Sequence, residues 1–394
     1  MSETKTEQSR EPEPQAGPSL IQQWLPSVKL TALSILLALI VGAVLIVVSN
    51  DEVVSSLDYF FSYPWDALSA AGEAIVDSYW ALLDGAFGSG SAIASTLERA
   101  APLACAGLGV TLAFRVGLFN IGAQGQIIAG SICAGYVGFT WDLPPVVHLF
   151  AALLAALIGG AIWGGVVGVL KSQSGAHEVI VTIMLNYVAL SILRWLLTLD
   201  AFQVPGSNNP KSPNVDDSAA FPDILGVHSG VLIAVLAAVG VWWLLDRSTI
   251  GFEMRAVGAN AAASRTAGMS VARAYILAMV IAGMLAGLAG AQQVQGHGDA
   301  LTDGIAGSLG FDAITVSLLG RATPSGTVLA AILFGALTTG GRQMQASTGT
   351  PLDLTTVLQA MIVLFVAAPA LVRAVFRIRS AEGGGAVLAK GWNA

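Results

Sequence analysis

Ten long apolar runs constrain this chain more than any motif does. They lie near residues 28–48, 92–113, 120–140, 146–169, 179–199, 229–245, 273–293, 304–320, 325–341 and 354–375. A helix needs about 20 mainly apolar residues to cross the hydrocarbon core of a bilayer. Only 11% of the 394 residues are charged and 55% are hydrophobic, whereas about 25% of the residues of a typical soluble protein are charged. The sequence therefore predicts an all-α polytopic membrane protein with about ten transmembrane helices.

The distribution of basic residues predicts the orientation of these helices. An even number of spans places both termini on one side of the membrane. If that side is the cytoplasm, 14 of the 18 Lys and Arg residues face it, and four face the opposite side: Arg99, Arg194, Lys211 and Arg342. Because cytoplasmic loops are enriched in Lys and Arg, we expect both termini to be cytoplasmic.

The segments around the main bundle differ from it in composition. Residues 1–27 are mostly polar and contain several prolines, which predicts a disordered cytoplasmic arm before a first transmembrane anchor at 28–48. Residues 49–91 carry acidic and aromatic side chains but no basic ones, which predicts an extracytoplasmic segment with a short helix at the membrane interface. The core bundle is then expected at 92–378 and a cytoplasmic tail at 379–394.

No motif assigns chemistry to this chain. The sequence contains neither GxxxxGK[ST] nor GxSxG, and the pair His177-Glu178 is followed at the next ligand position by Val181 instead of histidine. Cys105 and Cys133 lie in apolar runs without other metal ligands nearby. We therefore expect no catalytic residue, no metal site and no cofactor. The net charge of −7 without a basic patch gives no reason to expect a nucleic-acid partner.

Polar residues inside the apolar runs mark a candidate solute pathway, because a polar group in a membrane is costly unless it pairs or lines a wet path. The candidates are Asn120, Gln124, Gln126, Thr182, Asn186, Gln292 and Asp312. Amides and hydroxyls both donate and accept hydrogen bonds, so they suit a neutral solute rich in hydroxyl groups. The same groups also stabilise membrane bundles by bonding between helices, and the sequence leaves both roles open.

The predicted span at 304–320 contains an acid, Asp312. Three glycines accompany it at a spacing of three: Gly304, Gly307 and Gly310. This pattern predicts a broken or partly re-entrant helix whose backbone lines a cavity. We expect Asp312 to bond exposed backbone groups there, whereas in an ion-coupled transporter it would bind the coupling ion.

Two other spans carry glycines four residues apart. They are Gly160, Gly164 and Gly168 in one span and Gly283 and Gly287 in another. Such stripes allow helices to cross closely. We expect them to serve packing, with no charged or aromatic ligand platform beside them.

The longest loop expected on the cytoplasmic side covers residues 246–272. It contains a helix-forming run, Asn260–Ala267, in which Asn260 suits the N-cap, and Gly268 follows as a C-terminal stop. A short helix closed at both ends predicts a docking surface for a partner. The alternative is an ordinary solvated loop held by lipid headgroups.

Several blocks of the sequence resemble a known group of transport proteins. RAVGANAAASRTAG at 255–268 is similar to the coupling loop of ribose- and branched-chain-type permeases of ABC importers, where a short cytoplasmic helix fits a cleft in the ATPase. Other importers begin this loop with Glu-Ala-Ala, but Ala262 stands where their Glu would be. GLFNIGAQGQ at 117–126, EVIVTIMLNY at 178–187 and GFDAITVSLLGRATPSG at 310–326 resemble the nucleoside-type permeases of the same superfamily.

This resemblance covers about residues 95–375 and implies a function. The chain is expected to be the membrane-spanning permease of an ABC importer for a neutral solute, above all nucleosides, in a bacterial plasma membrane. The implied partners are an ABC ATPase subunit that hydrolyses ATP, a second homologous permease or a second copy of this chain, and an extracytoplasmic substrate-binding lipoprotein. The implied ATPase-coupling residues are Glu253, Arg255, Gly258, Asn260, Ala262 and Gly268.

Other functions remain open at this point. A permease for a simple sugar such as ribose would carry the same features. A secondary transporter driven by an ion gradient would use Asp312 but would give no role to the 246–272 loop. A membrane scaffold or receptor would transport nothing.

Overall fold

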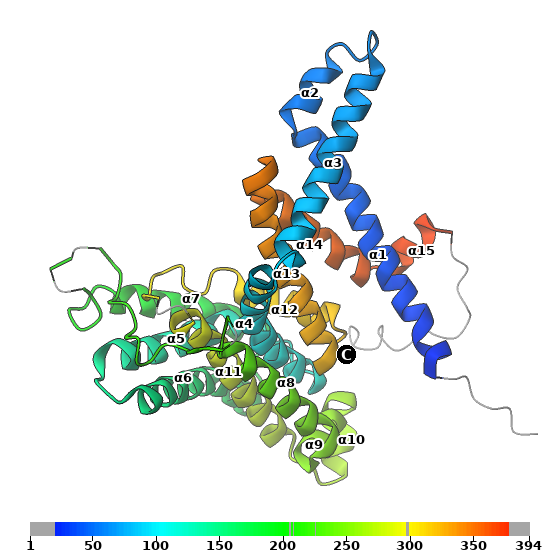
Figure 1. Ribbon diagram of the computed structural model, residues 1–394. Coiled ribbons are helices and arrows are strands. Elements are labelled where there is room, and N and C mark those ends of the chain that lie inside the picture. The colour runs from blue at the N-terminus through cyan, green and yellow to red at the C-terminus, as the bar shows by residue number, and fades with distance from the viewer. Residues whose placement is uncertain (1–19, 205, 208, 225, 297–298, 378–394) are drawn as a thin grey trace, which may run out of the picture.

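The structure is built mainly from helices (Figure 1). The computed structural model describes residues 20–377 apart from 205, 208, 225 and 297–298. The helices are α1 (Leu20–Ser49), α2 (Asp51–Leu57), α3 (Pro64–Phe87), α4 (Gly90–Arg115), α5 (Ala123–Thr140), α6 (Pro145–Ser174), α7 (Glu178–Leu196), α8 (Gly230–Arg247), α9 (Thr249–Ala259), α10 (Ala261–Thr266), α11 (Val271–Gln295), α12 (Leu309–Leu319), α13 (Pro324–Thr348), α14 (Leu352–Ala367) and α15 (Pro369–Val375). Two short strands, β1 (Asp223–Ile224) and β2 (Val227–His228), form an antiparallel hairpin.

Among the described residues, seven helices are long and apolar enough to cross a membrane: α1, α4, α6, α7, α8, α11 and α13. Each overlaps one of the ten predicted apolar runs over most of its length. Two shorter apolar helices, α12 and α14, accompany them. The chain is therefore a mostly helical, multi-pass membrane protein, while the total of ten spans and the side of the termini stay predictions.

The three remaining apolar runs form shorter or divided helices. The run at 120–140 forms α5, which has 18 residues. The run at 304–320 forms only the 11-residue α12, because the turns before it contain Gly304 and Gly307, and Gly307 has a φ of +45°. A helix of that length extends about 16 Å, which is too short to cross a hydrocarbon core of about 30 Å. The run at 354–375 is divided between α14 and α15 at Pro369, which has no backbone N–H to continue α14.

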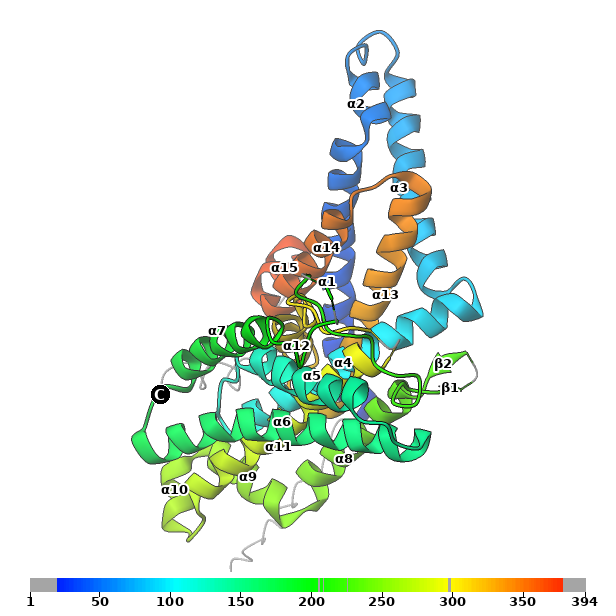
Figure 2. The same ribbon diagram turned by 90° about the vertical axis from the view of Figure 1, so that its left-hand side faces the viewer.

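Helix α11 lies at the centre of the bundle and packs against α4, α5 and α6 (Figure 2). A Cβ atom on Gly160 of α6 would collide with the carbonyl oxygen of Gly283 on α11. One on Gly164 would collide with the carbonyl oxygen of Met279. The predicted packing role of the two glycine stripes is confirmed, because only glycine allows the two backbones to approach this closely.

Helices α1, α2 and α3 extend away from this bundle (Figures 1 and 2). Helix α1 packs against α14, and α3 packs against α13. The hydroxyl of Tyr79 on α3 also donates to the carbonyl oxygen of Leu39 on α1 at 2.5 Å. These contacts join the N-terminal helices to the last part of the chain.

One helix boundary near the N-terminus differs from the predicted domain limits. Helix α1 begins at Leu20, so residues 20–27 are helical and do not form part of a disordered arm. Residues 49–91 contain two helices, the 7-residue α2 and the 24-residue α3. A short helix at the membrane interface in this segment stays a prediction, and the rest of the predicted arm and the tail at 379–394 lie outside the described residues.

Candidate functional site

Four of the predicted pathway residues meet at the first turn of α5. Asn120 is buried, and its Nδ2 donates to Oε1 of Gln126 at 3.2 Å. Its Oδ1 accepts from the N–H of Gly122 at 3.0 Å. Gly122 in turn lies against α7, because a Cβ atom added to it would be 3.0 Å from Cβ of Thr182. The fourth residue, Asn186, lies one turn further along α7.

Asn186 completes the N-terminus of α5. The N-cap residue of α5 is Gly122, which has no side chain to bond the free N–H groups of the first turn. Instead, Oδ1 of Asn186 accepts from the N–H of Gly125 at 2.8 Å, and its Nδ2 donates to the carbonyl oxygen of Ile121 at 2.9 Å. This polar side chain is therefore buried on α7 because it caps a neighbouring helix.

Gln124 performs a similar task for α12. Its Nε2 donates to the carbonyl oxygen of Gly307 at 2.7 Å, and its Oε1 accepts from the N–H of Gly310 at 2.8 Å. A Cβ atom on Gly310 would collide with the backbone of Gln124. The side chain thus joins the start of α5 to the start of α12 over a distance of more than 180 residues in sequence.

Asp312 lies in the first turn of α12 and is half-buried. Its Oδ2 accepts from the hydroxyl of Ser308, the N-cap residue, at 2.6 Å. Asp312 was expected to bond exposed backbone groups, but it bonds the side chain of Ser308. The backbone groups of this turn are bonded by Gln124 instead.

Two buried N–H groups at the α5 turn have no hydrogen-bond partner in the part of the chain that the structure describes: Nε2 of Gln126 and Nε1 of Trp163. A Cβ atom on Gly125 would lie 2.9 Å from Nε1 of Trp163 and 3.0 Å from Oδ1 of Asn186. A buried donor without a partner costs about 1–3 kcal/mol. These two groups are therefore the unsatisfied side-chain donors at the α5 turn among the described residues.

Trp163 was not among the residues expected here. It lies on α6 between Gly160 and Gly164, and the expectation that no charged or aromatic ligand platform accompanies this glycine stripe stays a prediction. One tryptophan in an apolar helix gives no sequence signal of its direction. Only the packing of α6 against α5 and α7 shows that its indole N–H lies beside Gly125 and Asn186.

Gln292, on α11, has different partners. Its Nε2 donates to Sγ of Cys105 on α4 at 3.3 Å. Its Oε1 is buried without a hydrogen-bond partner among the described residues, as is Oε1 of Gln295. The hydrogen bonds that the structure describes do not connect Gln292 to the α5 turn, so Gln292 is separate from the pathway candidates that meet there.

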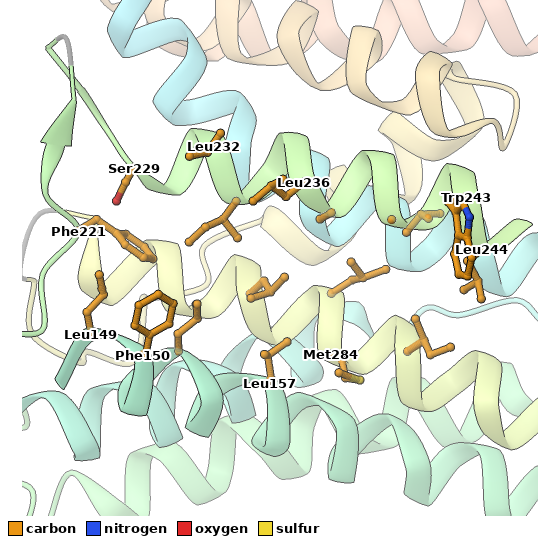
Figure 3. A pocket seen from close by; sticks show the side chains of 18 of the residues that line it. Leu149, Phe150, Leu157, Phe221, Ser229, Leu232, Leu236, Trp243, Leu244 and Met284 are labelled. Carbon is orange, nitrogen blue, oxygen red and sulfur yellow. The ribbon is translucent and has the colours of Figure 1, made fainter. Parts of the chain in front are cut away.

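An apolar cavity elsewhere in the bundle is not suited to a hydroxyl-rich solute. It has a volume of about 740 Å³ and lies between α6, α8 and α11. Its walls are apolar side chains such as Leu157, Leu236 and Met284 (Figure 3). Leu236 is 61% exposed, as expected for a surface that faces lipid. The α5 cluster, with its amides and indole, is the better candidate for contact with solute.

A second candidate surface is the α9–α10 segment, residues 246–272. Asn260 is the N-cap of α10, and its side chain accepts from the N–H of Ala263 at 3.0 Å. After α10, Gly268 has a φ of +86°, and the N–H of Met269 donates to the carbonyl oxygen of Ser264 at 3.0 Å. These bonds form a Schellman motif, so the helix expected between Asn260 and Gly268 is present.

The implied coupling residues divide into an exposed and a packed set. Asn260, Ala262 and Gly268 are exposed around α10, and Glu253 is half-buried on α9. Arg255 turns back to the end of α8, where it donates to the carbonyl oxygen of Leu245 and forms an ion pair with Asp246 at 3.1 Å. Arg255 is therefore occupied within the segment, whereas the α10 surface is free for a partner.

Gly258 connects this segment to the bundle. A Cβ atom on Gly258 would collide with the carbonyl oxygen of Arg115 at the end of α4. Nε of Arg115 donates to the carbonyl oxygen of Ala322 at 2.6 Å. Ala322 lies in the turn between α12 and α13 and has a φ of +48°. A displacement of α9 would thus act directly on α4 and on the turn that follows α12.

These features define a class of protein: a multi-pass helical membrane protein with amides buried between its helices and a capped, exposed helix pair outside the bundle. The chain belongs to the family described as "Branched-chain amino acid transport system / permease component", which matches residues 92–367. The match begins just after α3, so α1, α2 and α3 lie outside it.

Individual relatives cover more of the chain. It is 39% identical over 312 residues to the guanosine ABC transporter permease protein NupP of Bacillus subtilis (strain 168). This match covers 77% of this chain and 88% of the relative. It is 34% identical over 305 residues to the nucleoside ABC transporter permease protein NupB of Lactococcus lactis subsp. cremoris (strain MG1363), covering 73% and 82%. It is 33% identical over 312 residues to the glucose ABC transporter permease protein TsgB13 of Haloferax volcanii, covering 76% and 82%. The chain is accordingly an ABC permease, a transport subunit and not an enzyme.

Proposed function

We propose that this chain forms the translocation path of an ABC importer for nucleosides. The observation that carries the proposal is the 39% identity to a guanosine permease over 88% of that relative. The α5 cluster supports it, since the unpaired N–H groups of Gln126 and Trp163 suit the acceptor nitrogens and oxygens of a base, and an indole ring suits stacking against one.

The proposed topology follows the basic residues. Ten crossings would include α5 and the shorter helices α12 and α14, and both termini and the α9–α10 segment would be cytoplasmic. The plasma membrane of a bacterium is the proposed location. The exposed surface of α10 would then lie on the side where ATP is available.

The proposed partners follow from the two sides of the membrane. An ABC ATPase subunit would bind the α9–α10 segment, with Asn260, Ala262 and Gly268 at the contact and Gly258 passing movement to α4. A second homologous permease, or a second copy of this chain, would complete the pore. A substrate-binding lipoprotein would deliver the solute to the opposite side, where 200–228 and the α2–α3 region lie in the proposed topology.

A sugar is the second candidate solute. The glucose permease of Haloferax volcanii is 33% identical to this chain, only slightly less than the nucleoside relatives. Amide groups serve sugar hydroxyls as well as nucleosides. The ion-coupled alternative has lost its main support, since the family is one of transport-system permeases and Asp312 is bonded to Ser308.

Reconstituted transport tests this proposal. The chain would be placed in lipid vesicles with its ATPase, second permease and binding protein, and the uptake of labelled guanosine and labelled glucose would be compared with and without ATP. We expect ATP-dependent uptake of guanosine. Uptake of glucose alone would replace the solute, and uptake that persists without the ATPase would refute the importer.

A further inference from the structure

A polar pocket of about 460 Å³ lies where α3, α4 and α13 meet, away from the α5 cluster. The side chains that bear donors there are Ser89, Ser91, Ser95, Arg99, Thr339, Arg342 and Gln343. Two arginines in one pocket are unusual in a chain with only 18 basic residues. Both belong to the small set that the charge distribution places on the outer side.

Neither arginine has an ion-pair partner in the part of the chain that the structure describes. Three ion pairs within 4.0 Å occur among the described residues, and neither Arg99 nor Arg342 takes part in one or in a hydrogen bond with the described part of the chain. The positive charge of Arg342 repels the Arg99 guanidinium, and the Glu98 carboxylate attracts it. Oε1 of Glu98 already accepts from the backbone N–H of His228 at 3.2 Å. An anion between the guanidinium groups would remove their repulsion.

Further donors converge on the same space. Ser89 is the N-cap of the 26-residue α4, so the positive end of the helix dipole lies at the pocket. Oγ of Ser89 accepts from the N–H of Ala92 at 3.1 Å and lies 2.9 Å from Oγ of Ser91. Oγ1 of Thr339 is buried and has no hydrogen-bond partner among the described residues. These groups offer several N–H and O–H donors, and the carbonyl-type acceptors of the lining side chains are those of Asp84 and Gln343.

The walls of the pocket are held in place by close packing. A Cβ atom on Gly340 of α13 would collide with the carbonyl oxygen of Leu82 on α3. The hydroxyl of Thr96 on α4 donates to the carbonyl oxygen of Ala86 on α3 at 2.9 Å. The one acid of the lining, Asp84, has Oδ1 against Gly88 at the α3–α4 corner, where a Cβ atom would overlap it. The donors are therefore arranged before any ligand arrives.

We propose that this pocket binds a phosphoryl group, carried either by free phosphate or by the headgroup of a phospholipid. A phosphoryl group offers three strong acceptor oxygens and matches guanidinium groups in a bidentate manner. A carboxylate has two oxygens and would leave more of these donors unpaired. The proposal is independent of the solute that the permease carries.

Binding to the purified full-length chain in dodecyl maltoside micelles tests this assignment. The first arm titrates inorganic phosphate against chloride at constant ionic strength. The second arm adds dioleoylphosphatidylglycerol to the micelles, with dioleoylglycerol as the control lipid without phosphate. The midpoint of thermal unfolding reports binding in both arms. We expect saturable stabilisation by at least one probe, and the arm that responds identifies the source of the phosphoryl group.

Matched variants separate the pocket from general charge. Arg99→Gln and Arg342→Gln should each weaken binding about 10- to 100-fold, because a charge-assisted hydrogen bond is lost, and Arg342→Lys should weaken it less. Arg194→Gln removes an exposed arginine outside the pocket and should leave the binding of both probes unchanged. If Arg99→Gln lowers the melting temperature in the absence of a probe, the test uses Arg342→Gln, because Arg342 is exposed. The proposal fails if neither probe binds saturably, if acetate stabilises as well as phosphate, or if Arg194→Gln matches the pocket variants.

Discussion

The first turn of α5 and the α9–α10 segment both concentrate polar residues, but they use them in opposite ways. Around α5, the amides of Asn120, Gln124 and Asn186 are bonded to backbone groups of their own chain. Around α10, Asn260 closes a helix end and leaves the surrounding surface exposed. A buried polar group that loses its partner costs about 1–3 kcal/mol, whereas an exposed one bonds to water. A change near α5 should therefore lower stability first, and a change near α10 should lower coupling first.

The largest effect is expected at the connection between the two regions, for Gly258→Ala. The added Cβ atom would collide with the carbonyl oxygen of Arg115, and overpacking of this kind costs about 1–3 kcal/mol. Uptake in reconstituted vesicles should fall about tenfold or more while ATP hydrolysis continues. The matched control is Gly240→Ala on α8, where a Cβ atom would meet nothing within 4 Å. Equal uptake by the two variants would contradict a connection through Gly258.

Asn186→Ala tests the structural role of the α5 cluster. The change leaves the N–H of Gly125 and the carbonyl oxygen of Ile121 without partners, which should lower the free energy of unfolding by about 1–3 kcal/mol. Thermal unfolding in detergent measures this loss. Asn209→Ala, at an exposed amide, should leave the melting temperature unchanged. A stable Asn186→Ala protein that transports poorly would instead place Asn186 in direct contact with solute.

Asn260→Ala tests the α10 cap. Loss of an N-cap side chain costs a helix about 1 kcal/mol, so α10 should fray while the bundle remains folded. We expect fewer solute molecules transported per ATP hydrolysed, with little change in the melting temperature. Asn260→Ser should behave like the wild type, because serine also accepts the N–H of Ala263. A wild-type ratio in the alanine variant would show that the docked surface does not depend on this helix end.

The smallest effect is expected for Asp312→Asn. Asparagine keeps an oxygen that accepts the hydroxyl of Ser308, so uptake should stay within about twofold of the wild type. Asp312→Ala loses this acceptor and should destabilise more. A complete loss of uptake in Asp312→Asn, together with uptake that depends on an ion gradient, would revive the ion-coupled alternative.

Several features could be predicted from the sequence because neighbouring residues determine them. The seven candidate spans coincide with apolar runs, since the hydrophobicity of about 20 consecutive residues decides whether a helix can cross. The ends of α10 were predicted for the same reason, because a cap depends on residues three or four positions away. The glycine stripes predicted close helix packing, but they did not predict which helix would pack against each stripe.

Other features were decided only by the tertiary structure. The sequence pattern selected Gln124 and Asn186 but left open whether they bond solute or backbone, because their partners lie 61 to 186 positions away. Trp163 gave no signal, and the two arginines of the outer pocket were predicted only to share a side of the membrane. By itself the sequence determined where helices form, since helix formation and capping are local. The folding of distant segments against one another decided which polar groups are used up within the chain and which remain free for a ligand or partner.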